Sequence, residues 1–340
     1  MMTNFTGSSI VKFDVETRVT VNRVQFVHEN DSFAENVRLG LSSKQKFLLP
    51  KYFYDAMGSI LFEVICQLPE YYVTRTETEI LKRCCGEIVD ALPGPLTLIE
   101  AGSGSATKTR LLIETTLRRQ PSLLYVPMDI SYETLAESAT DLTSTFPTLQ
   151  VIAYAGDYFD SFQLLRDVPT ERKLVLFLGS SLGNFDPPND LSFLSMVRSM
   201  LEPSEGLILG LDLKKSAAIL EPAYDDALGV TAAFNLNLLN RINRELGANF
   251  DLHRFSHRAI YNQELGRVEM HLVSRCEQTV YVNQLDLYLN FADGETIHTE
   301  SSYKYDQQQI HTLASQAGFS CARTWHDRNA LFSLNLFIAK

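Results

Sequence analysis

The sequence predicts an α/β protein in which a doubly wound, mostly parallel sheet carries an inserted α+β segment. Between residues 96 and 213, short apolar runs alternate with segments of helix length. This alternation is typical of parallel strands that are covered by helices on both faces. After residue 213 it stops, and a helical stretch is followed by segments whose apolar residues alternate as in antiparallel strands.

The elements of the sheet follow from this alternation. Strands are predicted at 96–101, 124–129, 149–155, 174–178 and 207–211. Helices are predicted between them at 105–119, 131–144, 160–168 and 189–201. A further helix at 306–317 leads into a final hairpin of two strands, 319–325 and 331–338.

The remaining chain divides into an N-terminal part and the insert. Apolar spacing predicts a helix at 51–68, ended by Pro69, and a second helix near 77–90 that is capped by Thr74 or Thr76. In the insert, 214–250 is predicted helical. Strands follow at 267–275 and 278–282, and Asp293-Gly294 is predicted to form a hairpin turn. We expect residues 1–78 to pack with the insert, 214–304, while 79–213 and 305–340 form the sheet domain.

Composition narrows the possible partners. The net charge of −11 would repel nucleic-acid backbones and anionic lipid, so we expect neither nucleic acid nor membrane as a partner. No apolar run approaches the ~20 residues of a membrane span, and the first residues lack the pattern of a secretory signal. The five cysteines have no CxxC spacing and are read as reduced thiols of a cytoplasmic protein without a metal site.

A glycine-rich loop follows the first strand of the sheet and opens a helix. Gly102-Ser103-Gly104 would let a ligand approach the backbone closely, which suits either a dinucleotide or S-adenosylmethionine. Thr107 stands where a dinucleotide fingerprint needs a small residue, and the Glu100 carboxylate would repel pyrophosphate but attract a sulfonium. The predicted final hairpin also fits a methyltransferase sheet, so the loop favours S-adenosylmethionine.

Acidic residues end the next two strands. Asp129 is placed to accept hydrogen bonds from ribose hydroxyls; the alternative is a helix cap, a role that Ser131 could fill. Asp157 could accept the adenine amino group, with Tyr158 against the ring, or could simply form a turn. Lys108 lies in the first turns of the helix after the glycine loop, where the alternative is a solvated lysine.

Several longer motifs are specific to one family. They include Phe53-Tyr54-Asp55, Leu68-Pro69-Glu70-Tyr71-Tyr72, Thr74-Arg75-Thr76-Glu77, Phe177-Leu178-Gly179, Gly183-Asn184, Tyr224-Asp225-Asp226, Gly229-Val230-Thr231, Thr299-Glu300-Ser301-Ser302 and Lys304-Tyr305. With the glycine loop, they make the chain from about residue 48 onward resemble the histidine-specific Nα-methyltransferases of ergothioneine biosynthesis. The resemblance implies a Rossmann-like class I methyltransferase fold in which the insert and residues 1–78 bind substrate.

The resemblance also implies site residues. Those that would hold S-adenosylmethionine are Gly102, Lys108, Asp129, Asp157 and Tyr158. Asn184 and Tyr224 would hold the substrate carboxylate, and these two residues with Tyr54 form the implied catalytic set. Gly179, Thr231 and Tyr54 would surround the amine. The side-chain pocket would consist of Tyr71, Met270, Glu300 and Ser302, although Met270 reads equally well as core.

The chemistry explains why such residues would be used. Methyl transfer to a neutral amine depends mainly on placement, which can contribute ~7–11 kcal/mol of barrier lowering. Asn184 and Tyr224 would fix the carboxylate without a buried positive charge, which would repel the sulfonium. Glu300 and Ser302 alternate along a predicted strand and face one side, where they could accept an imidazole N–H; the alternative is a polar pair at a domain edge.

Three other functions use parts of the same evidence. An Nα-methyltransferase acting on another amino acid, such as a tryptophan derivative, is the nearest alternative, and Glu300 argues against it. An NAD-dependent oxidoreductase would use the glycine loop, and a regulatory module would bind the cofactor without reaction. We expect a monomer that trimethylates L-histidine to hercynine, the first step of ergothioneine biosynthesis.

Overall fold

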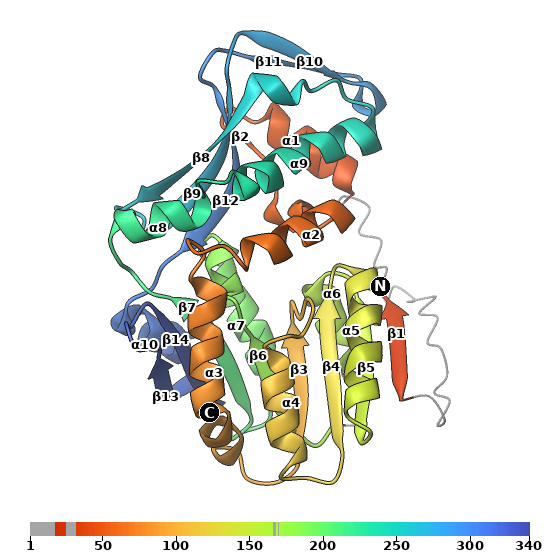
Figure 1. The fold of residues 1–340 in the computed structure, drawn as a ribbon, viewed down its shortest axis with the longest axis vertical. Helices are drawn as coiled ribbons and strands as arrows, with labels where there is room; N and C mark the ends of the chain where they lie inside the picture. Colours follow the sequence, from red (N-terminus) through yellow and green to blue (C-terminus); the bar gives the residue numbers. More distant parts are fainter. Residues whose placement is uncertain (1–17, 25–31, 166–167, 169) are drawn as a thin grey trace, which may run out of the picture.

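The computed structural model describes residues 18–24, 32–165, 168 and 170–340, which form two layers (Figure 1). The lower layer is an eight-stranded sheet of order β1-β5-β4-β3-β6-β7-β14-β13. Its strands are β1 (Val19–Arg23), β3 (Leu96–Ala101), β4 (Leu123–Asp129), β5 (Leu149–Ala155), β6 (Arg172–Phe177), β7 (Gly206–Asp212), β13 (Phe319–His326) and β14 (Phe332–Ala339). The residues judged for a secretory signal lie largely outside the described ranges.

Strands β1 and β3–β7 run parallel, and β14 and β13 close the sheet as an antiparallel hairpin. Helices cover both faces: α3 (Val73–Asp90), α4 (Thr109–Leu117) and α5 (Tyr132–Thr145) on one, α6 (Tyr158–Leu164), α7 (Asn189–Ser199) and α10 (Gln307–Gln316) on the other. The predicted doubly wound sheet is confirmed. Its strands are buried on both faces, as their continuous apolar sequences require.

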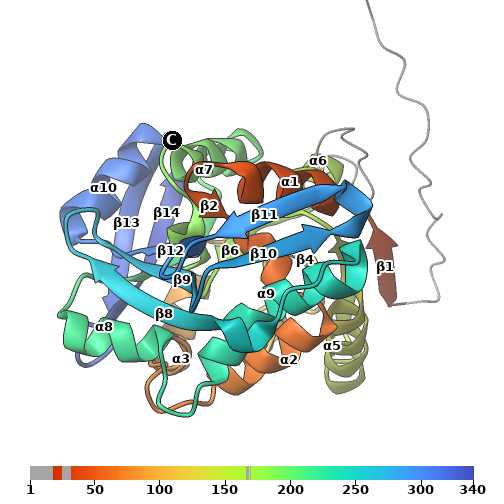
Figure 2. The same ribbon diagram turned by 90° about the horizontal axis from the view of Figure 1, so that it is seen from above.

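The upper layer contains a four-stranded sheet of order β2-β12-β9-β8 and a separate hairpin of β10 and β11 (Figure 2). The strands are β2 (Lys46–Phe47), β8 (Phe255–Asn262), β9 (Arg267–Ser274), β10 (Gln278–Val282), β11 (Leu287–Phe291) and β12 (Thr296–Tyr303). The helices are α1 (Phe33–Ser42), α2 (Ala56–Ile65), α8 (Ala217–Tyr224) and α9 (Val230–Leu246). The insert is thus α+β, as predicted.

Five details of the local predictions differ from the structure. Strand β1 pairs with β5 in the large sheet, so this part of 1–78 does not join the insert. The helix expected at 51–68 begins only at Ala56, because the Asp55 side chain caps it by accepting the Gly58 N–H at 2.8 Å. The helix α3 begins at Val73 without a side-chain cap.

The other two differences concern side chains and pairing. Thr76 is not a cap but lies inside α3, where its hydroxyl donates to the Tyr72 carbonyl at 3.1 Å. Gly294 does turn the chain, with φ +78°, but β11 and β12 on either side of it belong to different sheets. Asp293-Gly294 therefore makes no hairpin, since strand pairing is decided by longer-range contacts than the turn itself.

The parallel strands place the site. Their carboxyl ends all lie at the edge of the large sheet that faces the upper layer (Figure 1). The five cysteines are free thiols. Among the described helices, none has the length and apolar character needed to cross a membrane.

Candidate active site

The glycine loop leaves open space beside the end of β3. Gly102 and Gly104 have positive φ values of +70° and +50°, and a Cβ on either would meet no atom within 4 Å. The loop is held by backbone bonds, since the N–H groups of Gly102 and Ser103 both donate to the Met128 carbonyl. A ligand can therefore lie directly against this stretch of backbone.

Asp129 lies at the end of β4, beside this loop. Its Oδ2 accepts the Gly104 N–H at 2.8 Å and its Oδ1 accepts the Ser131 N–H at 3.0 Å. Burial raises the pKa of the carboxyl, although these bonds lower it. The predicted alternative, a cap for the next helix, belongs to Ser131, whose hydroxyl accepts the Thr134 N–H. Asp129 is therefore not the N-cap of the next helix, and its carboxylate faces the glycine loop.

Asp157 and Tyr158 begin α6 at the end of β5. Asp157 is the N-cap of the helix, and its Oδ1 accepts the Phe159 N–H at 2.9 Å. The alternative prediction, that Asp157 forms a turn, therefore describes its local structure. A contact between Asp157 and adenine would be an additional role. Tyr158 packs edge-on against Phe177, Phe185 and Phe193, at centroid distances of 5.7–6.1 Å.

Two charged residues predicted to face ligand have partners inside the protein. The Lys108 ammonium forms an ion pair with Glu77, which raises the pKa of the lysine despite the opposing effect of burial. Both Oε1 and Oε2 of Glu77 also accept the Gly179 N–H, at 2.9 and 3.0 Å. Glu77 is fully buried and thereby fixes the loop that follows β6.

Glu100 does not face the loop that it precedes. It is buried, and its carboxylate accepts hydrogen bonds from the hydroxyls of Thr109, at 2.6 Å, and of Tyr125. Burial raises the pKa of this carboxyl to about 7. The prediction that it attracts a cationic ligand is not supported by this geometry, because its oxygens join α4 to strands β3 and β4.

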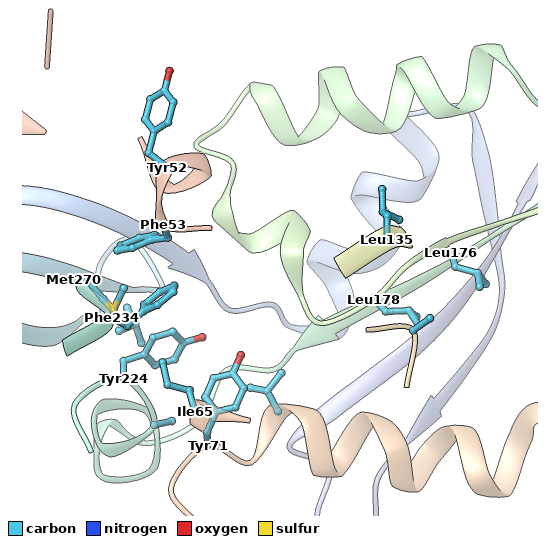
Figure 3. Packing of buried hydrophobic residues seen from close by; sticks show 14 of the residues in the cluster. Tyr52, Phe53, Ile65, Tyr71, Leu135, Leu176, Leu178, Tyr224, Phe234 and Met270 are labelled. Carbon is cyan, nitrogen blue, oxygen red and sulfur yellow. The ribbon is translucent and has the colours of Figure 1, made fainter. Parts of the chain in front are cut away.

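The upper layer contributes an aromatic wall. Tyr54 packs edge-on against Phe62 and Phe234 at 5.6 and 5.8 Å between ring centroids, and Tyr71 packs edge-on against Tyr224 at 6.3 Å. Figure 3 shows Tyr71 and Tyr224 side by side, with Met270 and Phe234 next to them. The predicted pocket residues Tyr71, Tyr224 and Met270 are therefore neighbours.

Glu300 and Met270, both predicted to line the side-chain pocket, are cross-strand neighbours. They are paired residues of β12 and β9, so their side chains lie on one face of the sheet. Burial raises the pKa of Glu300 to about 7, while Lys304 and a hydrogen bond with the Asn184 side chain lower it. Asn184, at the end of a short helical turn after β6, is thus in contact with Glu300.

Tyr224 and Ser302 share one polar cluster. Their hydroxyl oxygens are 2.9 Å apart, and the Lys304 ammonium donates to Tyr224 at 2.7 Å and to Ser302 at 2.8 Å. Lys304 also pairs with Asp212 at 2.9 Å, and neither charged side chain has any exposed area. The hydroxyls of Tyr224 and Ser302 are therefore both hydrogen-bonded to the ammonium of a buried ion pair.

Tyr54 connects the two halves of the site. Burial raises its pKa most, and the next largest contributions come from the charges of Glu300 in the upper layer and Asp129 in the lower. Tyr54 therefore stands between the predicted substrate pocket and the predicted cofactor loop. Thr231, in the first turn of α9, is buried near the same wall, and its N–H donates to Asp226 at 2.7 Å.

Comparison with known proteins agrees with this arrangement. The family model described as "Histidine-specific methyltransferase, SAM-dependent" matches residues 33–339. The chain belongs to this family. A histidine N-alpha-methyltransferase of Mycolicibacterium smegmatis is 41% identical to this chain, over 91% of this chain's length and 96% of its own length.

Two other relatives are less similar to this chain in sequence. Ergothioneine biosynthesis protein 1 of Schizosaccharomyces pombe is 28% identical over 82% of the chain but only 37% of its own length. A 4-dimethylallyltryptophan N-methyltransferase of Claviceps purpurea is 26% identical over 91% of the chain and 96% of its own. The family resemblance and the α/β class I methyltransferase fold inferred from the sequence are both confirmed.

Sequence reasoning missed the charged residues of the methyltransferase site that have no direct ligand role. Glu77, Asp212 and Lys304 are buried and lie far apart in the chain. Glu77 joins α3 to Lys108 within the lower layer, whereas the Asp212–Lys304 pair joins β7 to the upper layer through Tyr224. Their positions in the sequence could have identified them, since Glu77 and Lys304 occur in the family motifs and Asp212 ends a buried strand. Within the described residues, no group of three His, Cys, Asp or Glu side chains could hold a metal ion.

Proposed function

We propose that this methyltransferase transfers three methyl groups to the α-amino nitrogen of L-histidine and forms hercynine, the first step of ergothioneine biosynthesis. The observation that carries this proposal is the cluster of Tyr224, Ser302, Glu300 and Asn184 beside Tyr54. It combines a carboxylate site, an imidazole site and an aromatic surface within reach of the glycine loop.

The residues present suit S-adenosylmethionine. The open space beside Gly102 and Gly104 accepts a ligand against the backbone, and the Asp129 carboxylate is directed into the same region. Asp129 would hold the ribose, Asp157 and Tyr158 would hold the adenine, and Gly102 would contact the rest of the cofactor. When bound, S-adenosylmethionine supplies an electrophilic methyl group next to a positive sulfur. No metal ion takes part in this proposal.

The protein's own groups would place the amine. Tyr224 and Asn184 donate hydrogen bonds to the substrate carboxylate, which fixes the α-carbon. Gly179, Thr231 and Tyr54 enclose the nitrogen, and the Tyr54 ring can stabilise the positive charge of the methylated products. Such placement of a neutral amine lowers the barrier through orientation rather than through covalent chemistry.

The side-chain pocket would select histidine. Histidine would bind as imidazolium, with one ring N–H donated to the Glu300 carboxylate and the other to the Ser302 hydroxyl, while Met270 and Tyr71 pack against the ring. An apolar side chain would leave Glu300 without a partner, which is unfavourable in a buried site. A tryptophan derivative has a larger ring system and an apolar substituent, so Glu300 opposes it.

The residues assigned to the site all come from one chain, which agrees with the proposed monomer; the proposed substrate is a free amino acid of the cytoplasm. The division into a substrate-binding part, formed by the insert with α1, β2 and α2, and a cofactor-binding sheet domain is supported by the separate sheets.

Mass spectrometry tests the proposal directly. Histidine incubated with the purified chain and S-adenosylmethionine should gain three successive increments of one CH₂ each. Formation of a methylated tryptophan derivative, or of no product from either amino acid, would refute the assignment of histidine.

A further inference from the structure

A buried lysine stands behind the two hydroxyl groups of the predicted substrate pocket. The Lys304 ammonium has three N–H bonds and three acceptors: the Tyr224 hydroxyl, the Ser302 hydroxyl and the Asp212 carboxylate, at 2.7, 2.8 and 2.9 Å. No N–H is left over for a ligand. Lys304 therefore acts on a substrate only through the groups that it holds.

The spacing of the two hydroxyls constrains their protons. The Tyr224 and Ser302 oxygens are 2.9 Å apart, and the same ammonium holds both. Two oxygens at this distance repel each other unless a proton lies between them. One of the two hydroxyl protons is therefore committed to this contact, and only one is available to a bound molecule.

We propose that Lys304, anchored by Asp212, is a positioning residue that sets the direction of this hydroxyl pair and thereby the side-chain specificity. The inference rests on the proposed function, in which Tyr224 meets the substrate carboxylate and Ser302 meets the imidazole. A carboxylate only accepts hydrogen bonds, so Tyr224 must donate its proton to it. The Ser302 proton must then lie between the two oxygens, pointing to Tyr224.

The consequence is a requirement on the substrate. With its proton turned toward Tyr224, Ser302 presents only a lone pair to the side-chain pocket. A ring that brings an N–H satisfies it, whereas a ring nitrogen that only accepts faces a second lone pair. The pocket therefore selects for a donor in addition to the selection made by Glu300.

Lys215 offers a matched comparison for Lys304. It also pairs with Asp212, at 2.6 Å, and is nearly as buried. Its other partners are the Tyr72 hydroxyl, at 2.8 Å, and the Leu213 carbonyl, so its hydrogen bonds in the described part of the chain do not involve Tyr224 or Ser302. Removal of either lysine deletes one charge beside one carboxylate, but only Lys304 holds the hydroxyl pair.

The test compares two ligands by calorimetry at pH 6.5 in the presence of S-adenosylhomocysteine. L-Histidine, bound as imidazolium, brings one ring N–H for Glu300 and a second for Ser302. 3-(2-Pyridyl)-L-alanine brings a ring nitrogen that only accepts, and its affinity is measured by competition. In Lys304→Met the preference for histidine should fall about 10-fold or more, since one charge-assisted hydrogen-bond arrangement is lost. In Lys215→Met the preference should stay within about 3-fold of the original protein.

A second variant keeps the lysine. In Tyr224→Phe, both ligands lose a carboxylate contact, but the freed Ser302 proton can now turn to the ring, so the preference should again fall. This variant decides the matter if Lys304→Met does not fold, as judged by near-ultraviolet circular dichroism. An unchanged preference in Tyr224→Phe, or an equal fall in Lys304→Met and Lys215→Met, overturns the inference. Absence of methylated histidine with the original protein would instead refute the proposed function.

Discussion

Replacement of Glu300 by glutamine should stabilise the ligand-free protein while it weakens histidine binding. Burial raises the pKa of this carboxyl to about 7 from its ordinary value of 4.5. A raised pKa means that the fold disfavours the charged form. The folded protein holds the proton up to about pH 7, whereas the unfolded chain loses it near pH 4.5, so stability falls as the pH rises between these values.

The magnitude follows from the difference between the two pKa values. Relative to a neutral side chain, the carboxylate destabilises the fold by up to about 3 kcal/mol at pH 8 and by less than about 1 kcal/mol at pH 5. Glutamine has the same shape and can still accept the Asn184 hydrogen bond. For 340 residues, a gain of about 3 kcal/mol corresponds to a rise in Tm of roughly 4 °C.

The assay is thermal and urea denaturation of both proteins at pH 5 and pH 8 without ligand. Glu264→Gln, at an exposed turn residue between β8 and β9, is the matched control and should change stability by less than about 0.5 kcal/mol. The reasoning is refuted if Glu300→Gln is no more stable at pH 8, or if its advantage is the same at both pH values. Calorimetry should show at least about 10-fold weaker histidine binding.

Four further predictions test the site and the residues that support it. Because Glu300 ionises near pH 7, the pH profile of kcat/KM for histidine should contain an ionisation near this pH, which the profile of Glu300→Gln should lack; superimposable profiles would contradict it. Asp129→Ala should weaken S-adenosylhomocysteine binding about 10-fold or more by calorimetry, and unchanged binding would refute its assignment. Glu77→Gln should reduce stability by about 2 kcal/mol in urea, because it removes the charged partner of the half-buried Lys108 ammonium, whereas the nearby Glu79→Gln should have little effect; equal losses would count against the ion pair. Gly210→Ala should resemble Glu77→Gln, since its Cβ would lie 2.1 Å from the Glu77 Oε1; wild-type stability would contradict the packing.

The sequence was sufficient where local chemistry decides the structure. The strands β3–β7 are continuous apolar runs, so their burial and parallel arrangement could be predicted within a residue or two. The glycine loop and Asp129 could be predicted because the end of a parallel strand is a fixed place for a ligand. Glu300 and Ser302 could be placed on one face because they alternate along β12.

Prediction failed where distant contacts decide. Strand β1 is five residues long and gains its partner only from β5, more than 120 residues away. Asp293-Gly294 has the composition of a hairpin turn, but pairing of β12 with β9 separates it from β11. The orientation of Glu100 could not be predicted either, since the hydroxyls that donate hydrogen bonds to it belong to other elements, β4 and α4.

The buried charge near the substrate carboxylate shows how the site reconciles two opposing requirements. Neutral donors were expected because a cation in contact with the carboxylate would repel the approaching sulfonium, yet Lys304 lies immediately behind Tyr224. The Asp212 carboxylate, 2.9 Å from that ammonium, offsets its field at longer range. At the distance of one hydrogen bond, however, the ammonium still makes the Tyr224 hydroxyl a stronger donor. Under the proposed function, the substrate carboxylate would meet a polarised hydroxyl rather than a free charge. The Asp212 carboxylate, which also pairs with Lys215, would offset part of the positive charge near the sulfonium.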